Sequence, residues 1–213
     1  MPSAPAAMPS IIRPSSLRAW SAATPSNHLA SSPSNPTPTP KSAAVDISDR
    51  RVLHIRKIAR TTSGGKARQT WVMVVVGNNN GIAGLGTGRA LDSGAAIQKA
   101  ERNAKKNLVS FDRYDGRTVF SNQEHKYQAT HLRIWPLPPG SGVIASPHIH
   151  EICRCVGIHD IAVKTRGSRN PMNVCKAMFD ALAHQKTPEH IAKMRGKKVS
   201  DVTLTYFGDV INQ

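Results

Sequence analysis

The hydrophobic pattern first indicates β structure on either side of a glycine pair. Apolar and polar residues alternate loosely over residues 52–58, and residues 71–76 form a largely β-branched apolar run. Such patterns favour strands, and the intervening Ser63, Gly64 and Gly65 suit a tight turn because glycine accepts positive φ angles. We therefore expect two strands joined at Gly64-Gly65, a further turn at residues 78–81 and a third strand over residues 82–86.

A helical pattern follows, from Asp92 as an N-cap to about residue 109. One face of this predicted helix is apolar and holds Ala96, Ile97, Ala100, Ala104 and Leu108. The opposite side holds Lys99, Arg102, Lys105 and Lys106, with Glu101 at its margin. A charged helix face is usually only solvated, but a face of one sign suits phosphate backbones.

A second set of elements is predicted downstream. It comprises a strand at 131–135, a stiff turn at 136–142, a helix at 147–156 that ends at Gly157, a strand at 160–164 and a helix that opens at Asn170-Pro171. Glycine after a helix and proline at the first helical position are both common boundary signals. These elements form a second predicted module.

The glycines at 84, 86 and 88 raise the question of a phosphate-binding loop. They read G-x-G-x-G and are followed by Arg89, whereas a dinucleotide loop needs G-x-G-x-x-G and a P-loop ends in G-K-[ST]. We therefore expect these glycines to let a strand pass close to another surface. A nucleotide-dependent enzyme is the alternative that this loop leaves open.

The net charge of the chain indicates the class of partner that it binds. The 213 residues include 29 Lys and Arg against 13 Asp and Glu, which gives a formal charge of +16. Such a field attracts polyanions such as RNA, DNA or an anionic membrane surface, and the alternative is a basic enzyme for acidic small molecules. No apolar run reaches the roughly 18 residues that a membrane span needs. A three-stranded sheet with one basic helix resembles double-stranded-RNA-binding domains, which read shape and 2′-hydroxyls.

The residue patterns offer little support for a metal site or a catalytic site. His148, His150, Cys153 and Cys155 have the composition of a zinc site, but helical spacing puts them on different sides, and Cys153 fits a core position better. No nucleophile–base pair stands out, and we expect the other histidines, His125 and His184 among them, to lack acidic partners. The odd count of three cysteines suits free thiols in a reducing compartment.

The N-terminal segment has a different composition. Residues 1–40 hold nine of the 15 prolines, and Asp46 is the first acidic residue. A Ser-rich, Arg-bearing segment without acids is typical of a mitochondrial transit peptide, and a disordered tail is the alternative. We expect a leader at 1–45, a double-stranded-RNA-binding-like domain at 46–112, an α/β domain at 118–185 and a C-terminal extension at 186–213.

Several motifs together carry a family resemblance. In order they are RKIARTTSGGKARQTWVMVVVGNNNGIAGLGTGRA, AAIQKAERNAKKNL, GSGVIA, GIHDIAVKTRGSRNPMNVCKAM and TPEHIAKMRGKKVSDV. Over about residues 50–202 the chain resembles the fifth universal small-subunit ribosomal protein, the S-five family. The resemblance implies an α+β fold, in which the α/β domain contains a left-handed βαβ crossover.

The resemblance also implies a non-enzymatic structural constituent of the small ribosomal subunit, without a cofactor, a metal, a membrane or a small-molecule substrate. Its partners would be small-subunit rRNA, mRNA at the channel through which mRNA enters, and the fourth and eighth universal small-subunit proteins. The leader implies the mitochondrial matrix rather than a plastid. A free-standing double-stranded RNA-binding protein or RNA chaperone is the alternative, although such a protein has no need of the C-terminal TPEHIAKMRGKKVSDV motif.

Residues that match the basic positions of the family, with those around the glycine turn, form the predicted RNA-binding set: Arg56, Lys57, Arg60, Gly64, Gly65, Lys66, Arg68, Arg89, Lys99, Arg102, Lys105, Lys106, Lys164, Arg166 and Arg169. The loop at 60–66 matches the family loop that reaches rRNA and affects decoding. Ser63 stands where bacterial members usually have Lys, and Ile82 where they often have Arg. Both differences weaken the local phosphate-binding field.

Overall fold

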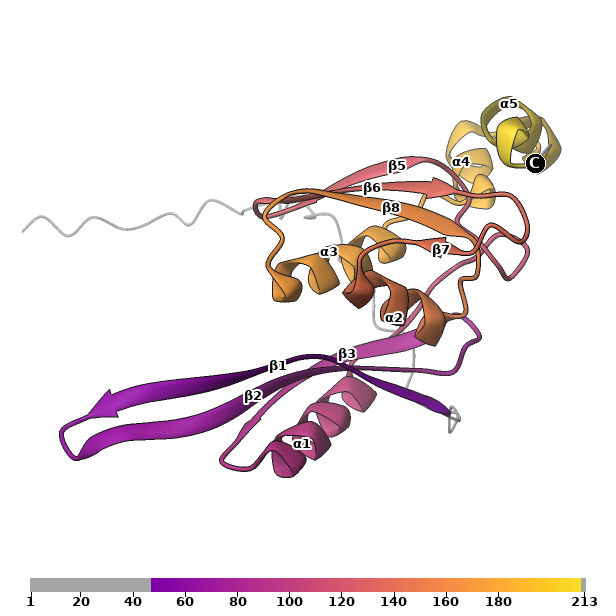
Figure 1. Ribbon diagram of the computed structural model, residues 1–213. Coiled ribbons are helices and arrows are strands. Elements are labelled where there is room, and N and C mark those ends of the chain that lie inside the picture. Colours follow the sequence, from indigo (N-terminus) through magenta and orange to yellow (C-terminus); the bar gives the residue numbers. More distant parts are fainter. Residues whose placement is uncertain (1–46, 212–213) are drawn as a thin grey trace, which may run out of the picture. The chain divides into compact units, whose positions relative to one another are not determined.

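The computed structural model describes residues 47–211, so the predicted leader at 1–45 lies outside the described residues. Two four-stranded sheets organise these residues (Figure 1). The first contains β1 (Asp49–Thr62), β2 (Gly65–Gly77), β3 (Ile82–Ala90) and β4 (Leu108–Ser110), with α1 (Ser93–Lys106) against it. The second contains β5 (Gln123–Tyr127), β6 (Thr130–Pro136), β7 (Val143–Ile144) and β8 (Ile161–Gly167), with α2 (Pro147–Val156) and α3 (Pro171–Ala183) beneath it. The chain continues into α4 (Pro188–Arg195) and α5 (Val199–Ile211).

The first sheet is antiparallel throughout, in the order β1-β2-β3-β4. Because side chains alternate across a strand, the apolar run of β2 is buried on both sides. Val72, Val74 and Val76 pack with α1, whereas Trp71, Met73 and Val75 join a larger core that includes α2 and α3. A register shift near Leu53 interrupts the pairing of β1 with β2.

The three glycines of β3 explain how α1 packs so closely on the sheet. A Cβ atom on Gly84, Gly86 or Gly88 would lie 2.2–2.3 Å from a carbonyl oxygen of α1, those of Ala104, Ala100 and Ala96 respectively. These glycines share one face of the strand at a spacing of two, and the alanines share one face of the helix at a spacing of four. The expectation that the glycines allow a close approach is confirmed.

The predicted end of α1 is wrong. The helix begins after Asp92 as expected, and the Asp92 carboxylate accepts hydrogen bonds from the backbone N–H groups of Gly94 (2.9 Å) and Ala95 (3.3 Å). It ends at Lys106, and the next residues form β4, in which Leu108 pairs with Gly84. Strand pairing therefore replaces the last predicted turn. The third strand also continues past residue 86 to Ala90.

The second sheet has the order β5-β6-β8-β7. β7 and β8 are parallel neighbours joined through α2, which gives the expected βαβ crossover. Helix α2 spans the predicted residues and ends at Gly157, whose φ of +84° is the left-handed conformation expected of the C-cap. Asn170 caps α3 by accepting a hydrogen bond from the Met172 N–H (3.3 Å).

The sequence patterns gave no prediction of β5, β7, α4 or α5. β5 reads QEHKY and is mostly polar because its side chains are only exposed or half-buried, so the apolar alternation of a strand is missing. β7 has two residues, too few for a pattern. None of the helices within residues 47–211 has the length and apolar character needed to cross a membrane.

Backbone hydrogen bonds join the first sheet to α2. The Asn79 N–H donates to the Cys155 carbonyl (3.1 Å), and the Gly81 N–H donates to the Val156 carbonyl (2.8 Å). Arg113 adds a side chain to this junction, because its guanidinium donates to the carbonyl oxygens of Gly157 (2.9 Å) and Gly116 (2.8 Å). Burial lowers the pKa of this arginine.

We expect Gly86→Ala to lower the free energy of unfolding by about 3 kcal/mol, because the added methyl group overlaps the α1 backbone in a closely packed core. Gly64→Ala is the matched control, since a Cβ atom at that position meets nothing within 4 Å. Urea denaturation of both variants measures the difference. Equal stabilities of the two variants would contradict the close-packing account of the β3 glycines.

Candidate nucleic-acid interface

The ends of β1 and β2 form a basic ribbon, which we define as residues 56–69. β3 pairs with β2 only from residue 70 onwards, so the ribbon extends beyond the third strand (Figure 1). Of its residues, Ile58 is half-buried and the rest are exposed on both faces. Alternation places Arg56 and Arg60 on one face, and Lys57, Lys66 and Arg68 on the other. The ribbon thus presents cations in two directions.

The turn of the ribbon is tight. Thr62 pairs with Gly65, and the Thr62 hydroxyl donates to the Gly65 carbonyl (2.9 Å). Gly65 has a φ of +125°, whereas Gly64 is absent from the residues of positive φ in the described chain. The expectation of positive φ values at this turn is therefore confirmed at Gly65 and wrong at Gly64.

At the base of the ribbon, three residues form a row across three strands. Arg56 pairs with Trp71, and Trp71 pairs with Arg89. The Arg56 guanidinium carbon lies 4.7 Å from the centre of the Trp71 ring, a cation–π contact that orients the arginine. Arg56 and Arg89 are both exposed, and they flank a tryptophan that is only 3% exposed.

The outer face of α1 is basic, but less uniformly than predicted. Lys99, Arg102 and Lys106 are exposed, and within residues 47–211 they form no ion pair. Lys105 instead lies 2.9 Å from Glu101, which also lies 2.8 Å from Arg50. The hydrogen bond from Lys105, followed by the one from Arg50, lowers the pKa of Glu101. Lys105 is therefore partly neutralised, and the free cations of α1 are the other three.

The remaining predicted residues belong to the second sheet and to the loop that follows β8. Lys164 and Arg166 are exposed on β8, and Arg169 is exposed in the loop between β8 and α3. The predicted set therefore divides among three surfaces: the ribbon with Arg89, the outer face of α1, and the second sheet.

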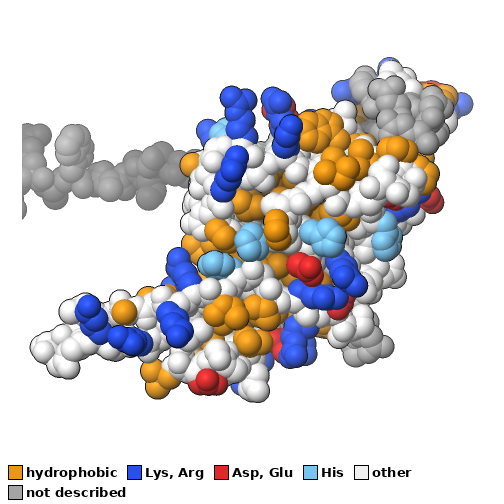
Figure 2. All heavy atoms as spheres, in the orientation of Figure 1, with side chains coloured by type: hydrophobic (Ala, Val, Ile, Leu, Met, Phe, Trp, Pro, Cys, Tyr) orange, Lys and Arg blue, Asp and Glu red, His pale blue; other side chains and the backbone are white. Residues whose placement is uncertain are grey.

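The sequence analysis missed three cationic or titratable residues beside Lys164 and Arg166. They are Lys126 on β5, and His131 and Arg133 on β6. Arg133 pairs with Lys164 and His131 with Arg166 in the sheet register. The signal was present for β6, where the outward His131 and Arg133 alternate with the apolar Leu132 and Ile134. Figure 2 shows Lys and Arg side chains gathered over the second sheet, at the top of that view.

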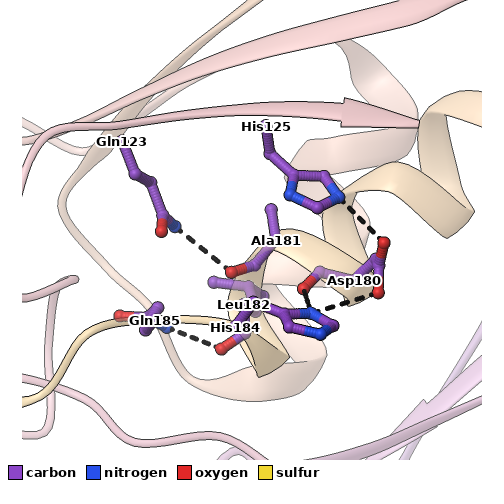
Figure 3. Close-up of polar contacts among 7 residues, drawn as sticks. All are labelled: Gln123, His125, Asp180, Ala181, Leu182, His184 and Gln185. Carbon is purple, nitrogen blue, oxygen red and sulfur yellow. Dashed lines mark hydrogen bonds and ion pairs between the residues drawn. The ribbon is translucent and has the colours of Figure 1, made fainter. Parts of the chain in front are cut away.

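The histidine expectation is wrong for His125 and His184, which share Asp180 (Figure 3). The His125 Nε2 lies 2.8 Å from one carboxylate oxygen, and the His184 Nδ1 lies 3.2 Å from the other. The two rings stack with centroids 6.1 Å apart. Packing of α3 against β5 brings together residues that are 55 positions apart, which no local pattern reveals. This cluster fastens α3 to β5.

The thiol interpretation is confirmed for Cys153, which is fully buried in the main core with Cys155 and Cys175. Burial raises the pKa of each thiol to about 12, which disfavours the thiolate that binds metals. His148 instead contacts the ring of His54, with centroids 6.1 Å apart. Within residues 47–211, no three His, Cys, Asp or Glu side chains are placed to hold a metal ion.

The fold thus defines a two-domain α+β protein with basic surfaces. Two family profiles match it: "Ribosomal protein S5, N-terminal domain" over residues 48–112 and "Ribosomal protein S5, C-terminal domain" over residues 125–195. The chain therefore belongs to the ribosomal protein S5 family, which is the S-five family of the sequence motifs.

Individual relatives support this assignment. The chain is 43% identical to a small ribosomal subunit protein uS5m of Schizosaccharomyces pombe, over 71% of this chain and 39% of the relative. It is 37% identical to the uS5m protein of Neurospora crassa, over 77% of this chain and 34% of the relative. A uS5 protein of Flavobacterium psychrophilum is 36% identical over 76% of this chain and 92% of the bacterial protein. The matched region thus spans well under half of both fungal relatives.

We expect Glu101→Gln to lower the free energy of unfolding by less than about 1 kcal/mol at neutral pH, the usual size for exposed ion pairs. The folded-state pKa of Glu101 is depressed, so its stabilising effect is present above its unfolded-state pKa and lost as the pH falls through the folded-state pKa. Denaturation at pH 7 and pH 3 therefore measures a difference from the wild type that shrinks in acid. A constant difference would contradict this account.

Proposed function

We propose that the protein is a structural constituent of the small ribosomal subunit of mitochondria, and that it binds small-subunit rRNA. The observation that carries this proposal is the joint occurrence of the S-five fold with exposed cations on the ribbon and on α1. Phosphate contacts by Lys and Arg provide most of the affinity of such surfaces and do not depend on base sequence. The two fungal relatives are named as mitochondrial-type uS5m proteins, which supports the compartment.

The proposed contacts differ between the two basic surfaces of the first domain. The ribbon inserts between rRNA segments, where its two cationic faces neutralise phosphates on both sides. Lys99, Arg102 and Lys106 on α1 face a duplex, as the basic helix of a double-stranded-RNA-binding domain does. The second domain adds Lys164, Arg166 and Arg169. The pairing of Lys105 with Glu101 gives this lysine a smaller part.

The proposed position is near the channel through which mRNA enters and near the decoding region, where the protein supports assembly and translation accuracy. The fourth and eighth universal small-subunit proteins are its proposed neighbours. Ser63 at the tip of the ribbon provides no charge, so the role of the tip in decoding depends on Arg60 and Lys66 at the sides of the turn.

Sedimentation tests the proposal. The tagged protein from a mitochondrial lysate is run through sucrose gradients, with and without EDTA to separate the subunits. Co-migration with the small subunit in EDTA, after a moderate-salt wash, is the expected result. Sedimentation near the top of the gradient would instead indicate a free-standing RNA-binding protein or RNA chaperone.

We expect the triple variant Lys99→Glu, Arg102→Glu and Lys106→Glu to lower incorporation into the small subunit at least tenfold, because three attractive phosphate interactions become repulsive. Quantitative mass spectrometry of gradient fractions measures the decrease. The matched control is Lys99→Arg, Arg102→Lys and Lys106→Arg, which substitutes the same three positions and keeps their positive charges. Normal incorporation of the α1 variant would contradict the assignment of this face to RNA.

We expect Gly65→Val to impair translation accuracy or subunit assembly, because valine is strained at a φ of +125° and the turn must rearrange. Gly64→Val is the control, since its position has no such φ and has open space for a side chain. A mitochondrial readthrough reporter, together with subunit profiles, measures the effect. Equal behaviour of the two variants would show that the shape of the turn is not needed.

A further inference from the structure

The outer face of the second sheet carries a dense cationic surface. We define it by the exposed residues Lys126 on β5, His131 and Arg133 on β6, and Lys164 and Arg166 on β8. The residues between them, among them Leu132, Ile134 and Val163, point into the core and are buried. Because side chains alternate along each strand, one face of this sheet packs in the core and the other face is open to a ligand. The cationic side chains stand out clearly above β5, β6 and β8 in Figure 2.

This surface opposes like charges across neighbouring strands. Arg133 lies directly opposite Lys164, and His131 lies between Lys126 and Arg166 in the register. Like charges at directly opposed positions destabilise a sheet. The carboxylate on this face, that of Glu124, lies 2.7 Å from Arg133 and leaves the other cations unbalanced. Repulsion between these cations costs stability in the free protein, and a bound polyanion relieves it.

The surface also offers shape and stacking groups. A hollow of about 540 Å³ lies at β5 and β6, and its lining includes Lys126, His131, Arg133 and Arg166. Further along β6, Trp135 occupies the same side of the strand as His131 and Arg133, opposite the small Ala162, and is half-buried. The outward side chains of β6 thus carry, in order, an imidazole (His131), a guanidinium (Arg133) and an indole (Trp135). Flat rings interleaved with cations are the chemistry of single-stranded nucleic-acid binding.

We infer that this face binds a single strand of RNA, separately from the ribbon and α1. Lys126, Arg133, Lys164 and Arg166 hold successive phosphates, while His131 and Trp135 stack on bases that are not paired. The bases of a duplex are already stacked inside it and are not free to stack on Trp135. An acidic peptide would satisfy the cations but not the rings. The inference rests on the proposed function in that the partner is RNA, but it assigns Lys164 and Arg166 to a single strand and adds Lys126, His131, Arg133 and Trp135 to the site.

Two RNA probes and two charge-reversal variants of the full chain test this inference, together with a poly-glutamate probe and the variant Trp135→Ala. The RNA probes are a fluorescent oligouridylate of about 12 nucleotides and an RNA duplex of about 16 base pairs, sizes suited to the two binding modes. The sheet variant is Lys164→Glu with Arg166→Glu, and the helix variant is Lys99→Glu with Arg102→Glu, so both change the net charge equally. Fluorescence anisotropy measures affinity over a range of salt concentrations. Thermal denaturation verifies folding, and the sheet variant is expected to be no less stable because Glu at position 164 faces Arg133.

The sheet variant is expected to lower affinity for oligouridylate at least tenfold, while its affinity for the duplex stays within about twofold; the helix variant is expected to do the reverse. The salt slope for oligouridylate should fall by about 0.7 for each phosphate that the variant no longer neutralises. Trp135→Ala should weaken oligouridylate binding by about tenfold with little change in that slope, because it removes stacking rather than charge.

Three outcomes would overturn the inference. Wild-type oligouridylate affinity in the sheet variant, with loss of duplex binding in the helix variant, would refute this site and leave the proposed rRNA binding intact. Failure of the wild-type protein to bind either RNA would count against both. Loss of poly-glutamate binding in the sheet variant, with unchanged RNA binding, would assign the face to an acidic protein instead.

Discussion

The close packing of α1 on β3 is the constraint on which the first domain depends. Glycines at three alternate strand positions leave the middle of one face of β3 without side chains, and alanines at a helical spacing complete the match. The helix can then lie almost backbone to backbone on the sheet, and its other side is fixed toward solvent. The position of the α1 cations is therefore a result of packing, since any larger residue at Gly86 would push the helix outward.

The two sheets use charge in different ways. In the first sheet, the cations lie on two separate elements, the β1–β2 ribbon and the outer face of α1. In the second sheet, basic residues stand opposite one another on neighbouring strands, which concentrates the field at one face. An ion pair within the protein lowers the positive charge of each surface. Lys105 pairs with Glu101 on α1, and Arg133 pairs with Glu124 on the second sheet.

Much of this architecture is predictable from local chemistry. The Asp92 cap, the Gly157 stop and the Asn170-Pro171 start each satisfy a backbone requirement within a few residues of their position. The end of α1 was not predictable in this way, because Leu108 is compatible with a helix and is drawn into a strand by its partner Gly84. The polar strand β5 and the Asp180 pairs with His125 and His184 likewise depend on interactions between distant residues. Lys164 and Arg166 were identified as basic residues, but only the register of β6 and β8 reveals the surface that they share.

The junction between the first sheet and α2 is made largely from main-chain groups. Asn79 and Gly81 donate through their backbone N–H groups, and Gly157 leaves no room for a side chain because a Cβ atom there would lie 2.0 Å from the Asn79 carbonyl oxygen. Main-chain hydrogen bonds are common to nearly all residue types. At positions 79 and 81 this joint needs a positive φ, which Asn and Gly tolerate best, and at positions 155 and 156 the side chains are fixed by the core that they fill. A substitution that shifts these main-chain groups therefore changes the spacing between the first sheet and α2, even where it leaves the surface charges unchanged.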